Sequence, residues 1–156
     1  MKRATAIIVL IAVVFALLSA FAEDKQVFIL CDPETPVNVR RTPKKGAEVS
    51  GRLDFGDEVE TDGLIRNGYL HVIGITEDGE GWIFAGYVVD DPPVKLERAM
   101  ATVASNGRVM AHRWIGGKRK SWLKVETDLR VYAISDEWAV TEKGYVRTEY
   151  LEVWYE

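Results

Sequence analysis

One cysteine, Cys31, and two histidines, His71 and His112, are the side chains best suited to nucleophilic catalysis. A catalytic cysteine needs a histidine base and usually sits at a helix start, which lowers its pKa. Cys31 instead follows the strand-like run 26–30 and precedes Asp32-Pro33, which is typical of a turn, and both histidines lie in strand-like runs. The pattern favours a small buried apolar side chain at position 31 over a nucleophile.

Other catalytic chemistry has no matching pattern. The carboxylates are numerous, but those of 54–62 have the spacing of a strand, for which a solvated face is the default interpretation. Neither a metal-ligand spacing nor a glycine-rich phosphate loop is present, so we expect no metal, no cofactor and no enzymatic activity. The basic cluster Lys118-Arg119-Lys120 is too short, in an acidic chain, to indicate nucleic-acid binding.

Aromatic side chains are the stronger candidates, because flat rings stack on sugar rings and peptide planes. Some of them equally suit the core of a small barrel, and for Trp82, Trp138 and Tyr145 the core is the favoured interpretation. Trp114 and Trp154 are better surface candidates, and Arg40 or Arg113 would supply polarity. The candidate ligand-binding residues are Tyr69, Trp82, Tyr87, Trp114, Trp138, Tyr145 and Tyr150.

The elements that position these rings are short β runs separated by turn residues, so we predict an all-β protein. The order of runs repeats on either side of Asp90-Asp91-Pro92-Pro93, a candidate linker in which two acids precede two prolines that cannot join a ladder and that make it stiff. The segment 94–100 suits either a short helix or a lead-in strand, and 76–80 suits a hairpin tip.

The repeat is supported by constant offsets within strands, which change only between strands, where insertions collect. The matched pairs are Val37 with Val109 at an offset of 72, Leu53 with Leu123 and Val59 with Leu129 at 70, Tyr69 with Trp138 at 69, and Trp82 with Tyr145 and Tyr87 with Tyr150 at 63.

This order resembles the bacterial SH3-like (SH3b) domain. Residues 37–43 (VNVRRTP) resemble its opening strand and turn, 49–59 its V-x-G-x-L-x-x-G-x-x-V segment, and 81–88 its closing G-W-V-x-x-x-Y-L segment. The second copy departs at its start, where Glu126 replaces a glycine, but 144–151 match closely. The resemblance implies two small SH3-like β-barrels in tandem, at 25–93 and 94–156. Each is marginal alone, so we expect them to pack together.

The alternation of 49–60 makes a more local prediction. Val49, Leu53, Phe55 and Val59 are expected to face inward, while the charged residues between them stay in water. Gly51 and Gly56 are expected to supply turn or bulge geometry.

The amino terminus predicts export. Lys2 and Arg3 precede the apolar run 6–18, and Ser19-Ala20-Phe21-Ala22 suits cleavage after Ala22. A retained membrane anchor is the alternative, but acids rather than a basic cluster follow. We therefore expect a signal peptide at 1–22 and a secreted or cell-envelope protein with no stable membrane span.

Charge separates the two copies. Residues 25–93 carry 7 basic and 13 acidic side chains, a net charge of −6, and 94–156 carry 11 and 9, a net charge of +2. Two functions fit these patterns. The resemblance favours a non-catalytic exported module that binds cell-wall peptidoglycan or its peptides. The charge asymmetry suits an adaptor that docks another exported protein through a barrel edge or the cleft between the copies.

Overall fold

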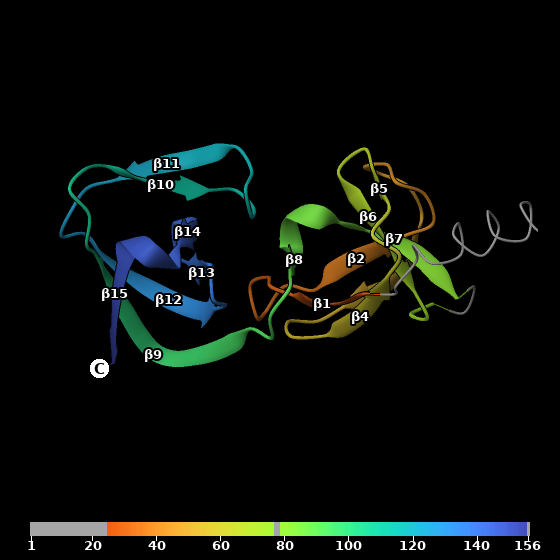
Figure 1. The fold of residues 1–156 in the computed structure, drawn as a ribbon, viewed down its shortest axis with the longest axis horizontal. Helices are drawn as coiled ribbons and strands as arrows, with labels where there is room; N and C mark the ends of the chain where they lie inside the picture. The colour runs from red at the N-terminus through yellow and green to blue at the C-terminus, as the bar shows by residue number, and fades with distance from the viewer. Residues whose placement is uncertain (1–24, 77–78, 156) are drawn as a thin grey trace, which may run out of the picture.

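The computed structural model describes residues 25–76 and 79–155, so the predicted signal peptide lies outside the described residues. The predicted all-β fold is confirmed, with two antiparallel sheets that follow one another along the chain and form two lobes (Figure 1). The first sheet, which we call module 1, contains β1 (Lys25–Ile29), β2 (Val37–Arg40), β3 (Val49–Leu53), β4 (Glu58–Thr61), β5 (Ile65–Arg66), β6 (Tyr69–Ile73), β7 (Glu80–Phe84), the 3₁₀ turn η2 (Ala85–Tyr87) and β8 (Val88–Val89).

The second sheet, module 2, begins directly after the predicted linker. It contains β9 (Val94–Val103), β10 (Val109–His112), β11 (Arg119–Leu123), β12 (Asp128–Ile134), β13 (Trp138–Thr141), β14 (Gly144–Arg147), the 3₁₀ turn η3 (Thr148–Tyr150) and β15 (Leu151–Tyr155). Segment 94–100, undecided from sequence, is part of the long strand β9. No helix among the described residues is long and apolar enough to cross a membrane.

Both modules have one topology, which confirms the internal repeat. The strand order β3-β2-β7-β6-β4-β1-β8 of module 1 corresponds, strand for strand, to β11-β10-β14-β13-β12-β9-β15 of module 2. The registers also correspond: Arg40 lies opposite Trp82 as His112 lies opposite Tyr145, and each first hairpin has an irregularity at the same place, after Val39 and after Ala111.

Each module has its own apolar core, built from strand residues that point to the inner face. In module 1 the fully buried side chains include Val39, Val72 and Ile83, and Cys31 belongs to the same cluster. In module 2 Val103, Leu129 and Val146 have the same role. The prediction that Cys31 is a small buried side chain is confirmed, since it is 3% exposed.

The prediction for 49–59 is correct except at its first residue. Leu53 and Val59 are buried and Phe55 is half-buried, but Val49 is 43% exposed. Val49 lies beyond the irregularity on the edge strand β3, opposite Arg40, and so it falls on the outer face of the sheet. Gly56 has the expected positive φ of +82°. Gly51 lies beside the irregularity but has no positive φ, and a Cβ added there would make only ordinary contacts, so its position does not require glycine.

Candidate functional site

The two modules are joined by a shared apolar cluster. Leu30 and Val89 of module 1 are buried together with Trp138, Val140 and Tyr145 of module 2. These side chains of module 2 cap module 1 rather than filling an inner core, so burial of the cluster depends on docking. The expectation that the modules pack together is met in this arrangement.

Hydrogen bonds fix the docked arrangement at three points. The buried Tyr145 hydroxyl donates to the Leu30 carbonyl at 3.2 Å, and the Ile115 amide donates to the Gly86 carbonyl at 3.0 Å. Beside the linker, the Asp136 amide donates to a carboxylate oxygen of Asp91 at 2.8 Å. Because these bonds are directional, they set the orientation of the modules as well as their contact.

Trp114 crosses from module 2 to module 1 because two glycines leave room for it. A Cβ on Gly117 would lie 2.0 Å from the Trp114 Nε1, and a Cβ on Gly86 would lie 2.6 Å from its Cδ1. Gly117 is in the loop between β10 and β11, whose turn is closed by its amide donating to the Trp114 carbonyl. The indole therefore folds back over its own loop and lies against η2 of the other module.

A cleft of about 600 Å³ lies along this junction. Its apolar wall is a chain of rings in which Phe84 is central: its ring centroid lies 5.7 Å from that of Tyr69, 5.7 Å from Tyr87 and 5.3 Å from Trp114, each edge to face. Tyr145 continues the wall, 6.2 Å from Tyr87. Edge-to-face contacts hold such rings in fixed orientations, so the wall is formed before any ligand arrives.

The polar rim of the cleft is mainly basic. Arg40, on β2, donates from Nη1 to the Ala47 carbonyl at 2.7 Å, which holds the guanidinium near the opening. Lys45 and Arg113 are exposed on the two sides, and Asp32 is the acidic group of the lining. Three cations against one carboxylate give the rim a preference for anionic groups, even though module 1 is acidic overall.

Burial favours the neutral forms of the Cys31 thiol and of the Tyr87 and Tyr145 hydroxyls in the cleft. Burial, with smaller contributions from Asp32, Asp54 and Asp57, raises the pKa of the Cys31 thiol to about 11. Burial is also the main cause that raises the pKa values of Tyr87 and Tyr145 above the usual range of a phenol. A neutral thiol is a poor nucleophile, and the lining of the cleft offers groups for hydrogen bonding and apolar contact.

Four of the seven candidate aromatic residues lie together in this cleft: Tyr69, Tyr87, Trp114 and Tyr145. Trp138 lies behind it and lines a smaller cavity of about 200 Å³ at the junction. Tyr150 and Trp82 lie elsewhere. Phe84, the central ring of the wall, was not among the sequence candidates. Its position two residues after Trp82, directly before the 3₁₀ turn, is the signal that could have indicated it.

Tyr150 lies in a second groove, of about 440 Å³, at the equivalent place in module 2. The lining residues Val109, Met110, His112, Arg147 and Tyr150 occupy the positions that Val37, Asn38, Arg40, Phe84 and Tyr87 have in module 1. Arginine replaces the central phenylalanine, and the exposed Trp122 has the guanidinium of Arg108 5.8 Å from its ring centroid. The lining of this groove comes from module 2 alone, whereas that of the cleft comes from both modules.

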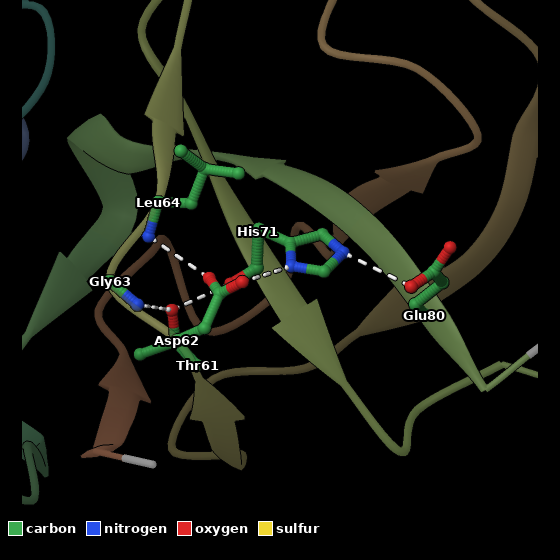
Figure 2. Close-up of polar contacts among 6 residues, drawn as sticks. All are labelled: Thr61, Asp62, Gly63, Leu64, His71 and Glu80. Atoms are coloured by element: carbon green, nitrogen blue, oxygen red, sulfur yellow. Dashed lines mark hydrogen bonds and ion pairs between the residues drawn. The ribbon is translucent and has the colours of Figure 1, made fainter. Parts of the chain in front are cut away.

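Trp82 lies beside His71, which belongs to a polar network that Figure 2 shows together with Asp62, Leu64 and Glu80. Its ring centroid is 4.9 Å from that of His71, whose Nδ1 lies 2.9 Å from an oxygen of Asp62 and whose Nε2 lies 3.5 Å from an oxygen of Glu80. The Leu64 amide donates to the other Asp62 oxygen at 2.9 Å. Hydrogen bonds from Leu64 and His71 lower the pKa of Asp62, outweighing the desolvation that opposes them.

This network does not form a catalytic triad. The polar and ring partners of the His71 imidazole are two carboxylates and an indole, none of which is a hydroxyl or thiol nucleophile. Among residues 25–76 and 79–155, no group of three or more His, Cys, Asp and Glu side chains is placed to hold a metal ion. The arrangement stabilises the turn between β4 and β6.

No protein-family model matches the sequence, and no curated protein matches it. Among solved structures, NlpC2 and NlpC1 from Trichomonas vaginalis are similar at 15% identity, each with a TM-score of 0.37. The match covers 85% of this chain and 49% and 46% of those chains, so the chain spans about half the length of either. Likeness at this level does not extend to individual residues or to activity.

Proposed function

We propose that the protein is an exported, non-catalytic binding protein of tandem SH3b-like modules, and that it recognises cell-wall peptidoglycan or its peptides in the cleft between the modules. The observation that carries the proposal is the cleft itself. It has a volume of about 600 Å³, a preformed aromatic wall and a basic rim. The export signal and the SH3b-like motifs of the sequence supply the expected compartment and ligand class.

The aromatic wall suits a ligand with flat, weakly polar faces. Phe84, Tyr87 and Trp114 meet edge to face, so ring faces remain for stacking on a sugar ring or a peptide plane. A preformed wall avoids the ordering cost that a flexible site would incur on binding. Both properties suit wall polymers, whose glycan and peptide parts present such faces repeatedly.

The rim suits the carboxylates of wall peptides. The guanidinium of Arg40 is anchored by the Ala47 carbonyl, and the lining also includes Lys45 of module 1 and Arg113 of module 2. An extended peptide in the cleft would place its carboxylates within reach of charge from both modules. Recognition would then require the docked pair, since neither module supplies the whole lining.

Three features support a role without catalysis. Burial keeps the Cys31 thiol neutral, His71 is engaged by carboxylates and an indole, and no metal cluster occurs in the described part of the chain. A productive site would need an ionised nucleophile with a base in reach, or a metal-bound water.

The test is co-sedimentation of the purified protein with insoluble cell-wall sacculi at low salt. We expect the protein to pellet, and Arg113→Ala to weaken the affinity by about fivefold, as loss of one rim charge does. Lys124→Ala, which removes an exposed cation of module 2 after β11 that does not line the cleft, is the matched control and should bind as the wild type does. Absence of pelleting, or equal loss in both variants, would contradict recognition in the cleft.

A second candidate function, an adaptor for another exported protein, is favoured by the edge strand β15. Trp154 and Tyr155 lie 41% and 66% exposed on this last strand of the second sheet, where an extended segment of a partner could add a strand. A photo-crosslinking residue at position 155 should then capture one dominant protein in the native envelope. Recovery of wall fragments alone would count against the adaptor.

A further inference from the structure

A groove of about 520 Å³ on another side of the junction shares only Asp32 with the cleft described above. One wall is the loop between β1 and β2, which contributes Asp32 and Glu34. The other wall is formed by β9 and β12 of module 2, which contribute Lys95, Arg98 and Arg130, with Tyr132 between them. Acidic groups of one module thus face basic groups of the other.

These opposite charges do not pair with each other. In the described part of the chain, no carboxylate lies within ion-pair distance of Lys95, Arg98 or Arg130, although acids and bases line the same groove. Like charges crowded on one wall repel, so a groove in this state gains free energy when a ligand supplies counter-charges. A ligand that satisfied both walls would need an anionic end and a cationic end.

The basic wall is shaped by an irregularity that the repeat does not require. Between the pairs Lys95–Ala133 and Ala99–Val131, three residues of β9 lie opposite Tyr132 alone. Arg98 ends this bulge with a φ of +56°, a conformation that costs a non-glycine residue free energy. In module 1 the equivalent strands β1 and β4 pair without interruption from Lys25 to Phe28.

The acidic wall is also held in place. Asp32 accepts a hydrogen bond from the Glu34 amide at 3.0 Å, and its carbonyl accepts from the Thr35 amide at 2.9 Å. Pro33 and Pro36 further restrict this loop. Both walls therefore present their charges on constrained backbone, which lowers the entropic cost of binding.

We propose that this groove binds a small zwitterion of the amino-acid or short-peptide class, with its carboxylate at Lys95, Arg98 and Arg130 and its ammonium group at Asp32 and Glu34. Tyr132 and the aliphatic part of Leu96 form the apolar surface between the charged ends. A purely anionic ligand would leave the two acids unpaired and repelled, and a purely cationic one would do the same to the three bases.

The test is titration of the purified protein with glycine, diglycine and triglycine, followed by amide chemical shifts in an NMR spectrum. The series separates the charged ends by successive residues, about 3.5 Å each when extended. We expect shifts confined to 32–34, 95–98 and 130–132, and one length that binds best. N-acetyldiglycine and diglycine amide, which lack one charge each, should bind at least about tenfold more weakly.

Substitutions separate a binding role from a structural one. Arg98→Gly keeps the backbone conformation, because glycine adopts a positive φ freely, but it removes the guanidinium. We expect Arg98→Gly and Arg130→Gln to unfold at the wild-type denaturant midpoint and to weaken diglycine binding by about tenfold, as loss of a charged hydrogen bond does. Arg52→Gln, on β3 outside the groove, is the matched control and should change neither property.

Three results would overturn the proposal. The first is the absence of localised shifts at millimolar diglycine. The second is equal binding of N-acetyldiglycine or of inorganic phosphate, which would show that the acids take no part. The third is unchanged binding in both arginine variants. Because none of these residues except Asp32 lines the cleft, retention of wall binding in Arg98→Gly would keep the two proposals separate.

Discussion

Gly86 gives the sharpest test of how the cleft is assembled. A Cβ at this buried position would lie 2.6 Å from Phe84 Cε1, 2.6 Å from Trp114 Cδ1 and 2.9 Å from Trp114 Cβ. All three distances are far below van der Waals contact, and two of them cross between the modules. Gly86→Ala should therefore push Trp114 away and weaken docking by about 2 kcal/mol, the middle of the range for overpacking.

The assay is native-state amide exchange, because single amides report on docking and on folding separately. The Ile115 amide donates to the Gly86 carbonyl across the junction, whereas the His71 and Ser135 amides donate within modules 1 and 2. If the variant lowers the free energy of docking by about 2 kcal/mol, the undocked state is about 30-fold more populated, and the Ile115 amide exchanges about 30-fold faster. We expect His71 and Ser135 to exchange at close to their wild-type rates.

The matched control is Gly107→Ala, at a turn of module 2 where an added Cβ meets nothing within 4 Å and φ is not positive. That variant should be neutral or more stable by about 0.5 kcal/mol, through the unfolded state. Unchanged exchange at Ile115 in Gly86→Ala would refute the steric reasoning. Equal acceleration at all three amides would also refute it, since the change would then act on folding of the modules.

Three further predictions concern single side chains. Tyr145→Phe leaves the buried Leu30 carbonyl without its donor and should lower the free energy of unfolding by about 1 kcal/mol in urea titration. Asp62→Asn should lower the free energy of unfolding at neutral pH. Because the folded-state pKa of Asp62 is lowered, this difference from the wild type should shrink as pH falls below about 4. A difference in unfolding free energy that does not change with pH would contradict the network around His71. Cys31, with its raised pKa and 3% exposure, should resist alkylation at pH 8 until urea unfolds the chain, and rapid labelling of the native protein would show an accessible thiolate instead.

The repeat and the strands were predictable because they depend on local alternation and on constant offsets. The pairs Trp82–Tyr145 and Tyr87–Tyr150 occupy equivalent register positions, as their spacing indicated. Their environments were not predictable, since Tyr145 is 6% exposed under module 1 while Trp82 is only half-buried on an open face. Register tells which face of a sheet a residue is on, but not whether another module covers that face.

The sequence predicted the aromatic character of the candidate site, but not which residues come together to form it. The sequence named seven candidate aromatic residues in the two copies, but it did not show that Tyr69 and Tyr87 meet Trp114 and Tyr145 across the junction. Two glycines decide where Trp114 lies, and the space they leave is visible only once both modules are docked. Val49 was misplaced for a related reason, since a one-residue irregularity changes the face of every residue beyond it.

The hydrogen bond from Tyr145 to the Leu30 carbonyl spans 115 positions of the chain. Each sheet closes through strand pairs that are themselves distant in sequence, such as Phe28 with Val89 and Val103 with Leu151, but the contact between Tyr145 and Leu30 also needs residues of both sheets. The complete cleft therefore needs both modules in place, because its lining comes from each of them. Fragments cut at the linker, or chains whose synthesis stops early, would lack part of this lining and display no complete site.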